Sequence, residues 1–375
     1  MSSSNPTIWR ILDANFNRAR EALRVVEEYA RFDLNDGAIT EALKTARHRL
    51  GAAMDRMAQS CAPGRSDGPG RLVGARDTAG DVGRALTTPT EFKRNGTGHV
   101  ALTSCKRLTE ALRGLEEYGK LVHAGFAGEM ERLRYDAYEI ERRLALTVRG
   151  RDRFGHALLY VLITEQFCRN DWWATAQAAL AGGADALQLR EPDLPDRELL
   201  GRAERLVSLC HEHSALLIVN NRADVAAASG AGGVHLGQDD LPVAAARRIL
   251  PDGVIGLSTH TIEQMESGVR AVPDYLAVGP MFPSATKPQG HIAGPETLAT
   301  AGRRTALPLV AIGGIDADNV GAVRAAADCC ICVCRAVIAQ ADVAEAAARL
   351  KSALRATVNA GLDGSERRVA RPGRT

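Results

Sequence analysis

The sequence predicts a (β/α)8 barrel preceded by a mostly α-helical N-terminal domain. Eight short apolar runs, which we expect to be strands, begin near positions 158, 184, 216, 233, 254, 275, 307 and 329. Helical patterns separate nearly all of these runs, as parallel strands require. Eight strand–helix units in about 205 residues match the count and size of a small barrel. Residues 1–148 contain no convincing strand. An open, doubly wound sheet is the alternative, because periodicity alone does not show that a sheet closes.

The N-terminal region carries a helical pattern that occurs twice. Between Ile11 and Ala30, apolar residues recur at spacings of three and four, which predicts an amphipathic helix with one buried face. The pattern returns 89 residues later. The matching residues are Arg18, Glu21, Ala22, Leu23, Arg24, Glu27, Glu28 and Tyr29 in the first copy, and Arg107, Glu110, Ala111, Leu112, Arg113, Glu116, Glu117 and Tyr118 in the second. Together with helical stretches near 38–58 and 127–147, this predicts an internally duplicated bundle.

These patterns also predict the domain boundaries. We place the helical domain at 1–148, a polar and basic linker at 149–155, the barrel at 156–360 and a disordered tail at 361–375. The sequence does not indicate what the helical domain does. Between its two halves, a glycine-containing loop carries Arg76, Asp77 and Asp81, the one cluster there that we nominate for a separate activity.

The composition is that of an ordinary soluble enzyme. The chain has 375 residues, of which 45% are hydrophobic and 25% charged. Its net charge of +2 gives no electrostatic reason to expect a nucleic-acid partner. No apolar stretch is long enough to span a membrane, and the residues after Met1 lack the features of a signal peptide. We therefore expect a cytoplasmic protein with small-molecule ligands; the sequence leaves open whether it forms a homo-oligomer.

Four of the eight cysteines lie close together in the last apolar run, at positions 329, 330, 332 and 334. One interpretation is a zinc site. Alternate residues of a strand lie about 6.6 Å apart, whereas thiolates on one zinc lie about 3.8 Å apart. We favour the other interpretation, in which these cysteines are small apolar residues of a buried barrel strand.

Short polar clusters follow the apolar runs in order along the chain. They are Gln188-Leu189-Arg190, Asn220-Asn221-Arg222, Asp239-Asp240, Ser258-Thr259-His260, Ser284-Ala285-Thr286-Lys287, Gly313-Gly314 and Cys334-Arg335. In a parallel barrel the C-terminal ends of the strands converge on one mouth, so these clusters would form a single site. Guanidinium, ammonium, hydroxyl and amide groups with a carboxylate and a glycine turn suit a ligand that carries several phosphates.

Each cluster also has a plainer interpretation. Arg190 could form an ion pair with Glu191, and Asn220, Asn221 and Asp240 could cap helices. The loop at 279–290 could be an ordinary solvated loop. His235, on the fourth strand, is more readily a hydrogen-bonded barrel histidine than an acid–base group. The functional interpretation depends on the ordered occurrence of all the clusters at strand ends.

Seven motifs in order make the chain resemble the thiamine-phosphate synthases, also called thiamine-phosphate pyrophosphorylases. They are QLRE at 188–191, VNNRADVA at 219–226, GVHLGQDDLP at 233–242, GLSTH at 256–260, VGPMFPSATK at 278–287, AIGGI at 311–315 and DNV at 318–320. The helical region resembles an N-terminal extension found on some of these enzymes. The resemblance implies a TIM barrel and a transferase of thiamine biosynthesis. This enzyme would join 4-amino-2-methyl-5-hydroxymethylpyrimidine diphosphate to a thiazole phosphate, with Mg²⁺ as cofactor and thiamine phosphate and pyrophosphate as products.

The resemblance also implies roles for individual residues. The substrate-binding residues would be Gln188, Leu189, Arg190, Glu191, Pro192, Asn220, Ser258, Ser284, Ala285, Thr286, Lys287, Gly314, Cys334 and Arg335. Within this set, Gln188, Arg190, Asn220, Ser258 and Lys287 would contact the pyrimidine diphosphate, and Ser284, Thr286, Gly314, Cys334 and Arg335 the thiazole phosphate. Asn221 and Asp240 would hold Mg²⁺. The catalytic residues would be Arg190, Ser258 and Lys287, the two cations stabilising the departing pyrophosphate.

Two positions depart from the pattern of that family. Asn221 stands where the family usually has an aspartate, which removes a negative charge from the metal site. Pro192 replaces the lysine of a QLREK motif, which removes a cation from the diphosphate side. We expect weaker metal or diphosphate binding unless Arg222 or a residue of the N-terminal domain compensates.

Two other functions remain as alternatives. A thiazole tautomerase would need the thiazole phosphate site but not the diphosphate cluster, so Arg190, Asn220, Ser258 and Lys287 argue against it. A non-catalytic metabolite-binding scaffold would use the charged face of the duplicated helix, for which solvent exposure is the simpler explanation. Release of pyrophosphate from the two substrates distinguishes the synthase from both.

Overall fold

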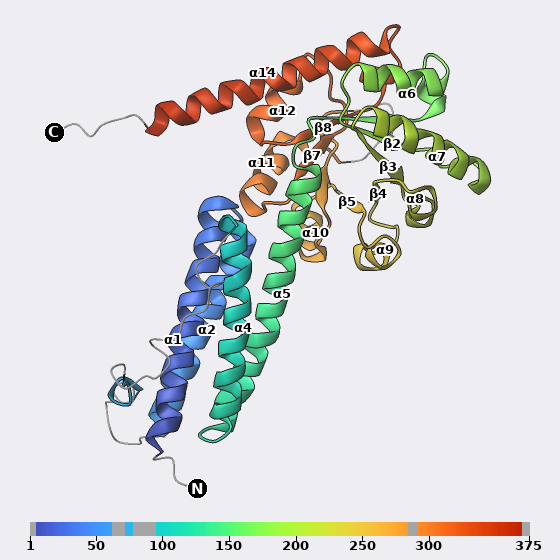
Figure 1. Ribbon diagram of the computed structural model, residues 1–375. Coiled ribbons are helices and arrows are strands. Elements are labelled where there is room, and N and C mark those ends of the chain that lie inside the picture. The colour runs from blue at the N-terminus through green and yellow to red at the C-terminus, as the bar shows by residue number, and fades with distance from the viewer. Residues whose placement is uncertain (1–4, 62–71, 78–94, 284–290, 370–375) are drawn as a thin grey trace, which may run out of the picture. The chain divides into compact units, whose positions relative to one another are not determined.

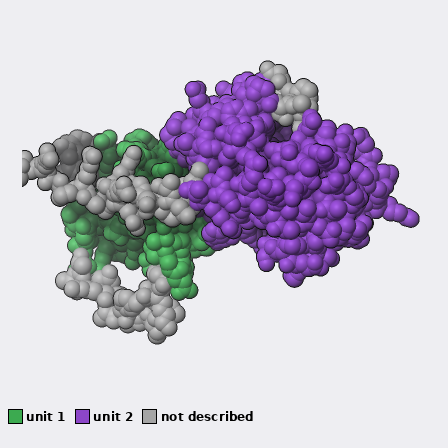
Figure 2. Space-filling view, turned by 90° about the horizontal axis from the view of Figure 1, so that it is seen from above, with its two compact units in different colours: residues 1–148 green, residues 149–375 purple. Residues whose placement is uncertain are grey.

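The computed structural model describes residues 5–61, 72–77, 95–283 and 291–369, with side chains described as far as residue 356. The chain forms two compact units, Met1–Val148 and Arg149–Thr375, which are coloured separately in Figure 2. None of the helices within the described ranges has both the length and the apolarity needed to cross a membrane.

The second unit is a closed barrel of eight parallel strands (Figure 1). The strands are β1 (Leu159–Ile163), β2 (Ala186–Leu189), β3 (Leu216–Asn220), β4 (Gly233–Leu236), β5 (Val254–Thr259), β6 (Tyr275–Val278), β7 (Leu309–Ile312) and β8 (Cys330–Val333). Each strand pairs with its neighbours in the sequence, and β8 closes the ring by pairing with β1. The predicted barrel is therefore confirmed, and the open sheet is excluded.

Helices follow the strands and surround the barrel. They are α6 (Trp172–Ala181), α7 (Asp196–Glu212), α8 (Ala223–Ser229), α9 (Val243–Ile249), α10 (Ile262–Ala271), α11 (Gly294–Arg304), α12 (Val320–Ala326), α13 (Arg335–Ile338) and α14 (Val343–Val369). A short 3₁₀ turn, Glu165–Phe167, precedes α6. The helix α14 continues to Val369, past position 361 where the composition suggested a disordered tail. Alanine, leucine, glutamate and arginine, which favour helix, make up much of its sequence.

The centre of the barrel holds one buried cluster of aromatic, aliphatic and cysteine side chains. The ring of Phe154 stacks on that of Tyr275, with centroids 4.3 Å apart, and Tyr160 meets both rings edge-on. Cys330 and Cys332 lie in the same buried cluster on β8. Their setting is the one we favoured from the sequence, a buried strand with small apolar side chains.

Within the described part of the first unit there are four long helices: α1 (Pro6–Glu28), α2 (Gly37–Ser60), α4 (Thr97–Gly119) and the first part of α5 (Ala124–Phe154). A single π-helical turn, Tyr29–Asp33, follows α1. The helix α1 packs against both α2 and α4. Residues 149–154, which we expected to be a linker, continue α5 as regular helix. Arg149 in this extension pairs with Asp274 of the barrel, at 3.3 Å.

The buried faces of these helices show the duplication directly. In α1 the buried residues Leu12, Ala19, Ala22, Leu23, Val26 and Glu27 have the same spacing as Ala101, Leu108, Ala111, Leu112, Leu115 and Glu116 in α4. In α2 the buried residues Ile39, Leu43, Ala46, Leu50, Ala53 and Met57 have the same spacing as Phe126, Met130, Leu133, Ala137, Ile140 and Leu144 in α5. Each α1–α2 position therefore has a counterpart in α4–α5.

Candidate active site

A cavity of about 620 Å³ opens at the C-terminal ends of the barrel strands. Residues from all eight strands or the loops directly after them contribute to its wall. This is the end at which a parallel barrel gathers side chains that are far apart in the sequence. The volume lies within the usual range of small-molecule sites.

The cavity collects most of the described residues that the sequence nominated. Those that line it are Gln188, Arg190, Asn220, Asn221, Asp240, Ser258, Gly314, Cys334 and Arg335. Leu189, Glu191 and Pro192 belong to the same motif as Arg190 but are not among the lining residues. Ser284, Ala285, Thr286 and Lys287 lie outside the described residues.

Arg190 and Glu191 have separate environments although they are adjacent. The Oε1 atom of Glu191 accepts a hydrogen bond from the backbone N–H of Glu165 at 2.6 Å, and Arg202 lies 3.8 Å away. Glu191 therefore supports the turn after β1, and burial raises the pKa of its carboxyl. Among the residues that the structure describes, no carboxylate forms an ion pair with Arg190. The predicted alternative, an Arg190–Glu191 pair, is absent from this set, and the Arg190 guanidinium is available at the cavity wall.

A chain of buried hydrogen bonds crosses the barrel beneath the cavity. The amide nitrogen of Gln188 donates to the Tyr160 hydroxyl at 2.6 Å, and the hydroxyls of Tyr160 and Tyr275 are 3.2 Å apart. The Nδ1 atom of His235 lies 2.9 Å from the Tyr275 hydroxyl, and its Nε2 atom lies 2.8 Å from Oγ of Ser258. His235 is therefore the hydrogen-bonded barrel histidine that we favoured from the sequence.

The tautomer of His235 decides which group donates in each of these hydrogen bonds. Burial lowers the pKa of His235 to about 4, with nearby His260 as a smaller cause, so the imidazole is neutral near pH 7 and carries one N–H. In the tautomer that carries the proton on Nε2 of His235, Tyr275 donates to Nδ1 and accepts from Tyr160, which accepts in turn from Gln188. The Nε2–H of His235 donates to Ser258. The Ser258 hydroxyl proton and the Gln188 carbonyl oxygen are thereby left for a ligand.

Asn221 and Asp240 lie on the same wall of the cavity, after β3 and β4. Asn221 has a positive φ of 63°, and its N–H donates to the carbonyl oxygen of His235 at 2.8 Å. One carboxylate oxygen of Asp240 accepts from the N–H of Gly237 at 2.6 Å, which leaves the other oxygen free of that bond. Asp239 lines the cavity as well. These hard oxygen donors fit Mg²⁺, which commonly takes one or two carboxylates together with water and phosphate oxygens.

Arg222 does not supply the missing positive charge. Its guanidinium pairs with Asp196 at 2.5 Å and with Asp224 at 2.7 Å, and it is not among the cavity-lining residues. Both carboxylates hold Arg222 against the start of α7 and α8. The compensation that we considered for Pro192 and Asn221 therefore cannot come from Arg222 in this conformation.

The glycines after β7 allow two backbone segments to meet at the cavity wall. Gly313 and Gly314 both have positive φ, 98° and 67°. A Cβ atom on Gly314 would lie 2.7 Å from the carbonyl oxygen of Pro283. No side chain fits there, so the peptide groups themselves form this part of the wall. Cys334 and Arg335 approach the same cavity after β8.

Sequence reasoning missed several residues of the cavity. Tyr160 and Thr164 come from β1 and its end, Gln238 follows β4, and His260 follows β5. Thr164 has a buried hydroxyl without a hydrogen-bond partner among the described residues. His260 was visible in its cluster, but nothing in the sequence assigned it a role. Tyr160 gave no signal, because an aromatic residue within an apolar run looks like core.

Uncommitted cations, hydroxyls and oxygen ligands around one barrel mouth define a (β/α)8 enzyme that acts on phosphorylated small molecules.

The sequence profile of the thiamine monophosphate synthase family matches residues 159–337, and that of the ThiD2 family matches residues 10–143. The thiamine-phosphate synthase of Rhodopirellula baltica is 40% identical over 329 residues, which are 85% of each chain. That of Synechocystis sp. is 39% identical over 356 residues, which are 94% of this chain and 98% of the relative. The chain therefore belongs to the thiamine-phosphate synthase family.

A solved structure agrees with this assignment. Thiamine phosphate pyrophosphorylase from Pyrococcus furiosus is 33% identical, with a TM-score of 0.51, over 54% of this chain and 97% of that chain. The family, the barrel and the transferase class predicted from the sequence are confirmed. The enzyme is a transferase of thiamine biosynthesis that condenses the pyrimidine diphosphate with the thiazole phosphate to give thiamine phosphate and pyrophosphate.

Proposed function

We propose that the barrel mouth binds both substrates together, with Arg190, Asn220 and Ser258 on the pyrimidine diphosphate and Gly314, Cys334 and Arg335 on the thiazole phosphate. The observation that carries this proposal is that all six residues line one cavity of about 620 Å³ although they come from five strand ends. A cavity of this size brings two ring-sized ligands into contact, which is the main requirement for joining them.

The hydrogen-bond chain beneath the cavity supports the pyrimidine end of this arrangement. It leaves the carbonyl oxygen of Gln188 as an acceptor and, with the His235 proton on Nε2, the hydroxyl of Ser258 as a donor. An aminopyrimidine presents an amino group that needs an acceptor, and the diphosphate presents oxygens that need donors. In this role Tyr160, Tyr275 and His235 are positioning residues, since they act through Gln188 and Ser258.

The diphosphate and its metal would lie toward Arg190, Asn221 and Asp240. Within the described ranges, no group of three or more His, Cys, Asp or Glu side chains could hold a metal. A Mg²⁺ ion on Asp240 and the Asn221 amide oxygen would therefore complete its shell with phosphate oxygens or water. When bound, Mg²⁺ would neutralise charge on the leaving pyrophosphate. The second cation that the family resemblance implies for the diphosphate, Lys287, lies outside the described residues.

The reaction that this site favours breaks the bond between the pyrimidine methylene carbon and the diphosphate oxygen. The bonding electron pair leaves with pyrophosphate, and the electron-rich aminopyrimidine ring stabilises the resulting cation. The thiazole nitrogen then donates its lone pair to the methylene carbon and forms the new C–N bond. The protein contributes alignment and preorganised positive charge, and no covalent intermediate with a side chain is needed.

Pyrophosphate release tests this proposal directly. The full chain is mixed with the pyrimidine diphosphate and the thiazole phosphate, each alone and together, with and without added Mg²⁺. Sustained release that requires both substrates and Mg²⁺ supports the proposal. A thiazole tautomerase or a binding scaffold releases no pyrophosphate under any of these conditions, and release that is unaffected by chelation contradicts the role given to Asp240 and Asn221.

A further inference from the structure

The last residue of α5, Phe154, places an aromatic ring in the barrel at the end opposite the mouth. Its side chain is 2% exposed and belongs to the buried cluster at the barrel centre. Four other members of this cluster are the first residues of their strands, Ala186, Val254, Tyr275 and Cys330. Phe154 therefore lies at the N-terminal ends of the strands, and it is not among the residues that line the cavity.

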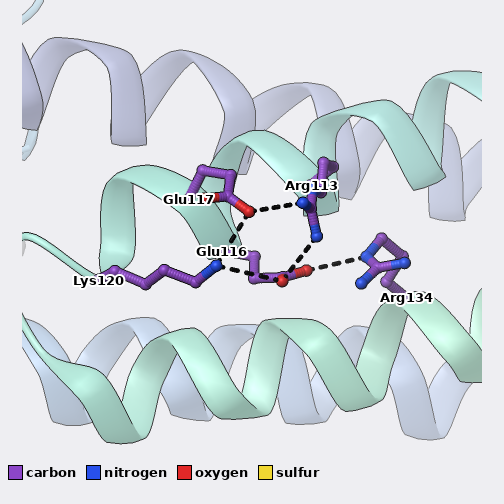
Figure 3. A network of polar contacts seen from close by, with 5 residues as sticks. All are labelled: Arg113, Glu116, Glu117, Lys120 and Arg134. Carbon is purple, nitrogen blue, oxygen red and sulfur yellow. Dashed lines mark hydrogen bonds and ion pairs between the residues drawn. The ribbon is translucent and has the colours of Figure 1, made fainter.

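The helix α5 is held by different contacts in its first part and at its end. In the first unit, Nε of Arg134 donates to Glu116 of α4 at 2.9 Å, within the ion-pair network that Figure 3 shows. Residues 149–154 belong to the barrel unit. There Arg149 pairs with the buried carboxylate of Asp274 at 3.3 Å. The barrel unit thus fixes the end of α5 by contacts of its own.

The last two turns of α5 contact two successive residues at the start of β6. Gly150 lies so close to Asp274 that a Cβ atom on this glycine would come within 3.1 Å of the Asp274 Cα atom. A side chain at position 150 would therefore push the helix away from β6. Phe154 follows four residues later, on the same face of the helix. Its ring stacks on that of Tyr275, with centroids 4.3 Å apart and planes 15° apart.

The ring of Tyr275 connects Phe154 to the mouth of the barrel. It lies directly over Gly256 of β5, where any Cβ atom would overlap it. His235 also stacks on this ring, with centroids 5.6 Å apart and planes 13° apart. The Tyr275 hydroxyl lies 2.9 Å from Nδ1 of His235, whose Nε2 atom lies 2.8 Å from Oγ of Ser258. Three nearly parallel rings therefore join Phe154 to the Ser258 hydroxyl.

A second series of contacts joins Phe154 to Gln188. The ring of Tyr160 meets Phe154 edge-on, with centroids 5.9 Å apart. The Tyr160 hydroxyl accepts from the Gln188 amide at 2.6 Å and lies 3.2 Å from the Tyr275 hydroxyl. Hydrogen bonds weaken steeply when their angles or distances are disturbed. Both series therefore depend on where two tyrosine rings lie, and Phe154 contacts both rings.

We propose that Phe154 is a positioning residue for the pyrimidine diphosphate. By fixing the rings of Tyr160 and Tyr275, it sets the hydrogen-bonding groups that meet this substrate. The inference rests on the proposed function, which gives this substrate to Gln188 and Ser258. Branched aliphatic side chains are enough to fill the interior of a barrel. An aromatic ring does more here, because aromatic pairs favour the stacked and edge-on angles at which both tyrosines are held.

Steady-state kinetics of pyrophosphate release by the full chain test the proposal in Phe154→Leu, which keeps an apolar side chain but removes the ring. KM for the pyrimidine diphosphate should rise roughly fivefold, the factor that corresponds to about 1 kcal/mol of aromatic pairing. KM for the thiazole phosphate should stay within twofold. The matched control is Leu206→Ala, at a fully buried position of α7 outside the cluster, which should leave both KM values within twofold. Urea unfolding confirms that each variant is folded, and Phe154→Met, a flexible filler, takes the place of a Phe154→Leu chain that does not fold.

A double variant separates positioning from packing. Tyr275→Phe already removes the hydroxyl through which Phe154 acts, so adding Phe154→Leu should raise KM for the pyrimidine diphosphate at least twofold less than the product of the two single effects. An unchanged KM for this substrate in Phe154→Leu, equal increases for both substrates, a change confined to kcat, or a double variant that reaches the product overturns the proposal.

Ser258→Ala distinguishes this failure from failure of the proposed function. If it leaves KM for the pyrimidine diphosphate unchanged, the proposed function is wrong at Ser258 and the inference about Phe154 falls with it. If Ser258→Ala raises this KM and Phe154→Leu does not, only the inference about Phe154 is wrong.

Discussion

The two ends of the barrel use charged side chains in opposite ways. At the N-terminal ends of the strands, Asp274 is fully buried and contacts Arg149, Arg247 and the backbone N–H of Ile255. Asp185 accepts from the N–H groups of Leu158 and Leu159 and pairs with Lys351. Each of these two carboxylates therefore has three partners within the barrel unit.

At the mouth, charged groups are left uncommitted. Within the described ranges, Arg190, Arg335 and Asp239 form no ion pair, although all three line the cavity. Desolvating a charge without a partner is costly, and these groups stay open to solvent, with Arg335 and Asp239 exposed and Arg190 half-buried, so a ligand can reach them. The comparison teaches that the residues that hold this barrel together differ from those that serve its reaction in how many protein partners their charged groups have, more than in charge itself.

The largest effect is expected at the closed end. Asp274→Ala leaves two arginines without their shared buried carboxylate and should lower the free energy of unfolding by about 3–5 kcal/mol. Urea denaturation measures this change. The control is Glu266→Gln, which removes a half-exposed partner of Arg304 and should cost less than about 1 kcal/mol. Equal losses in the two variants would show that the buried contacts of Asp274 contribute no more to stability than an exposed ion pair does.

At the open end the effect should be on activity. Arg190→Gln removes a preorganised cation and should lower kcat/KM for pyrophosphate release roughly 100- to 1,000-fold, by analogy with the loss of one transition-state donor. Its free energy of unfolding should stay within about 0.5 kcal/mol of the parent. Arg270→Gln, an exposed change on α10, is the matched control. A variant with activity within twofold of the parent would remove Arg190 from the reaction.

Acidification should act on the buried chain of hydrogen bonds through His235, which lies between the two ends of the barrel. His235 has a folded-state pKa of about 4, below the ordinary value of 6.5, so the unfolded chain binds this proton more readily. The contribution of neutral His235 to stability is complete above about pH 6.5 and is lost progressively as the pH falls toward 4. The slope due to this residue approaches about 1.4 kcal/mol per pH unit. His235→Gln should flatten the plot of unfolding free energy against pH by that amount. An unchanged slope would mean that His235 is already protonated in the folded state.

The smallest effect is expected from removing one hydroxyl, that of Tyr275, from the buried chain of hydrogen bonds. Tyr275→Phe removes the donor to Nδ1 of His235 and should lower kcat/KM by roughly 5- to 30-fold, equivalent to about 1–2 kcal/mol. Because Tyr275 acts through Ser258, the loss should appear mainly in KM for the pyrimidine diphosphate and leave KM for the thiazole phosphate unchanged. A uniform loss for both substrates would indicate a general packing defect instead.

The sequence predicted the barrel, and most of the described residues that it nominated line the mouth, because strand ends are marked locally. Gln188 and Arg190 alternate on one strand, and Gly313-Gly314 directly follows another, so their convergence follows from the fold alone. The hydrogen-bond chain could not be predicted in this way. Tyr160 and Tyr275 lie inside apolar runs and are 115 positions apart in the sequence. No local pattern therefore indicates that their hydroxyls meet.

Other features depended on partners that a sequence pattern does not reveal. Glu191 looked like part of the site but bonds to the turn at Glu165, and Arg222 looked available but pairs with Asp196 and Asp224. The duplicated glutamates were visible in the repeat.

The most direct test of the account measures activity and stability together in Arg190→Gln, using pyrophosphate release from both substrates and urea unfolding of the same preparation. We predict at least a 100-fold fall in kcat/KM with an unfolding free energy within about 0.5 kcal/mol of the parent. A stable variant that retains its rate, or one whose rate falls only because the barrel unfolds, would contradict the claim that unpaired charge at the mouth serves the reaction.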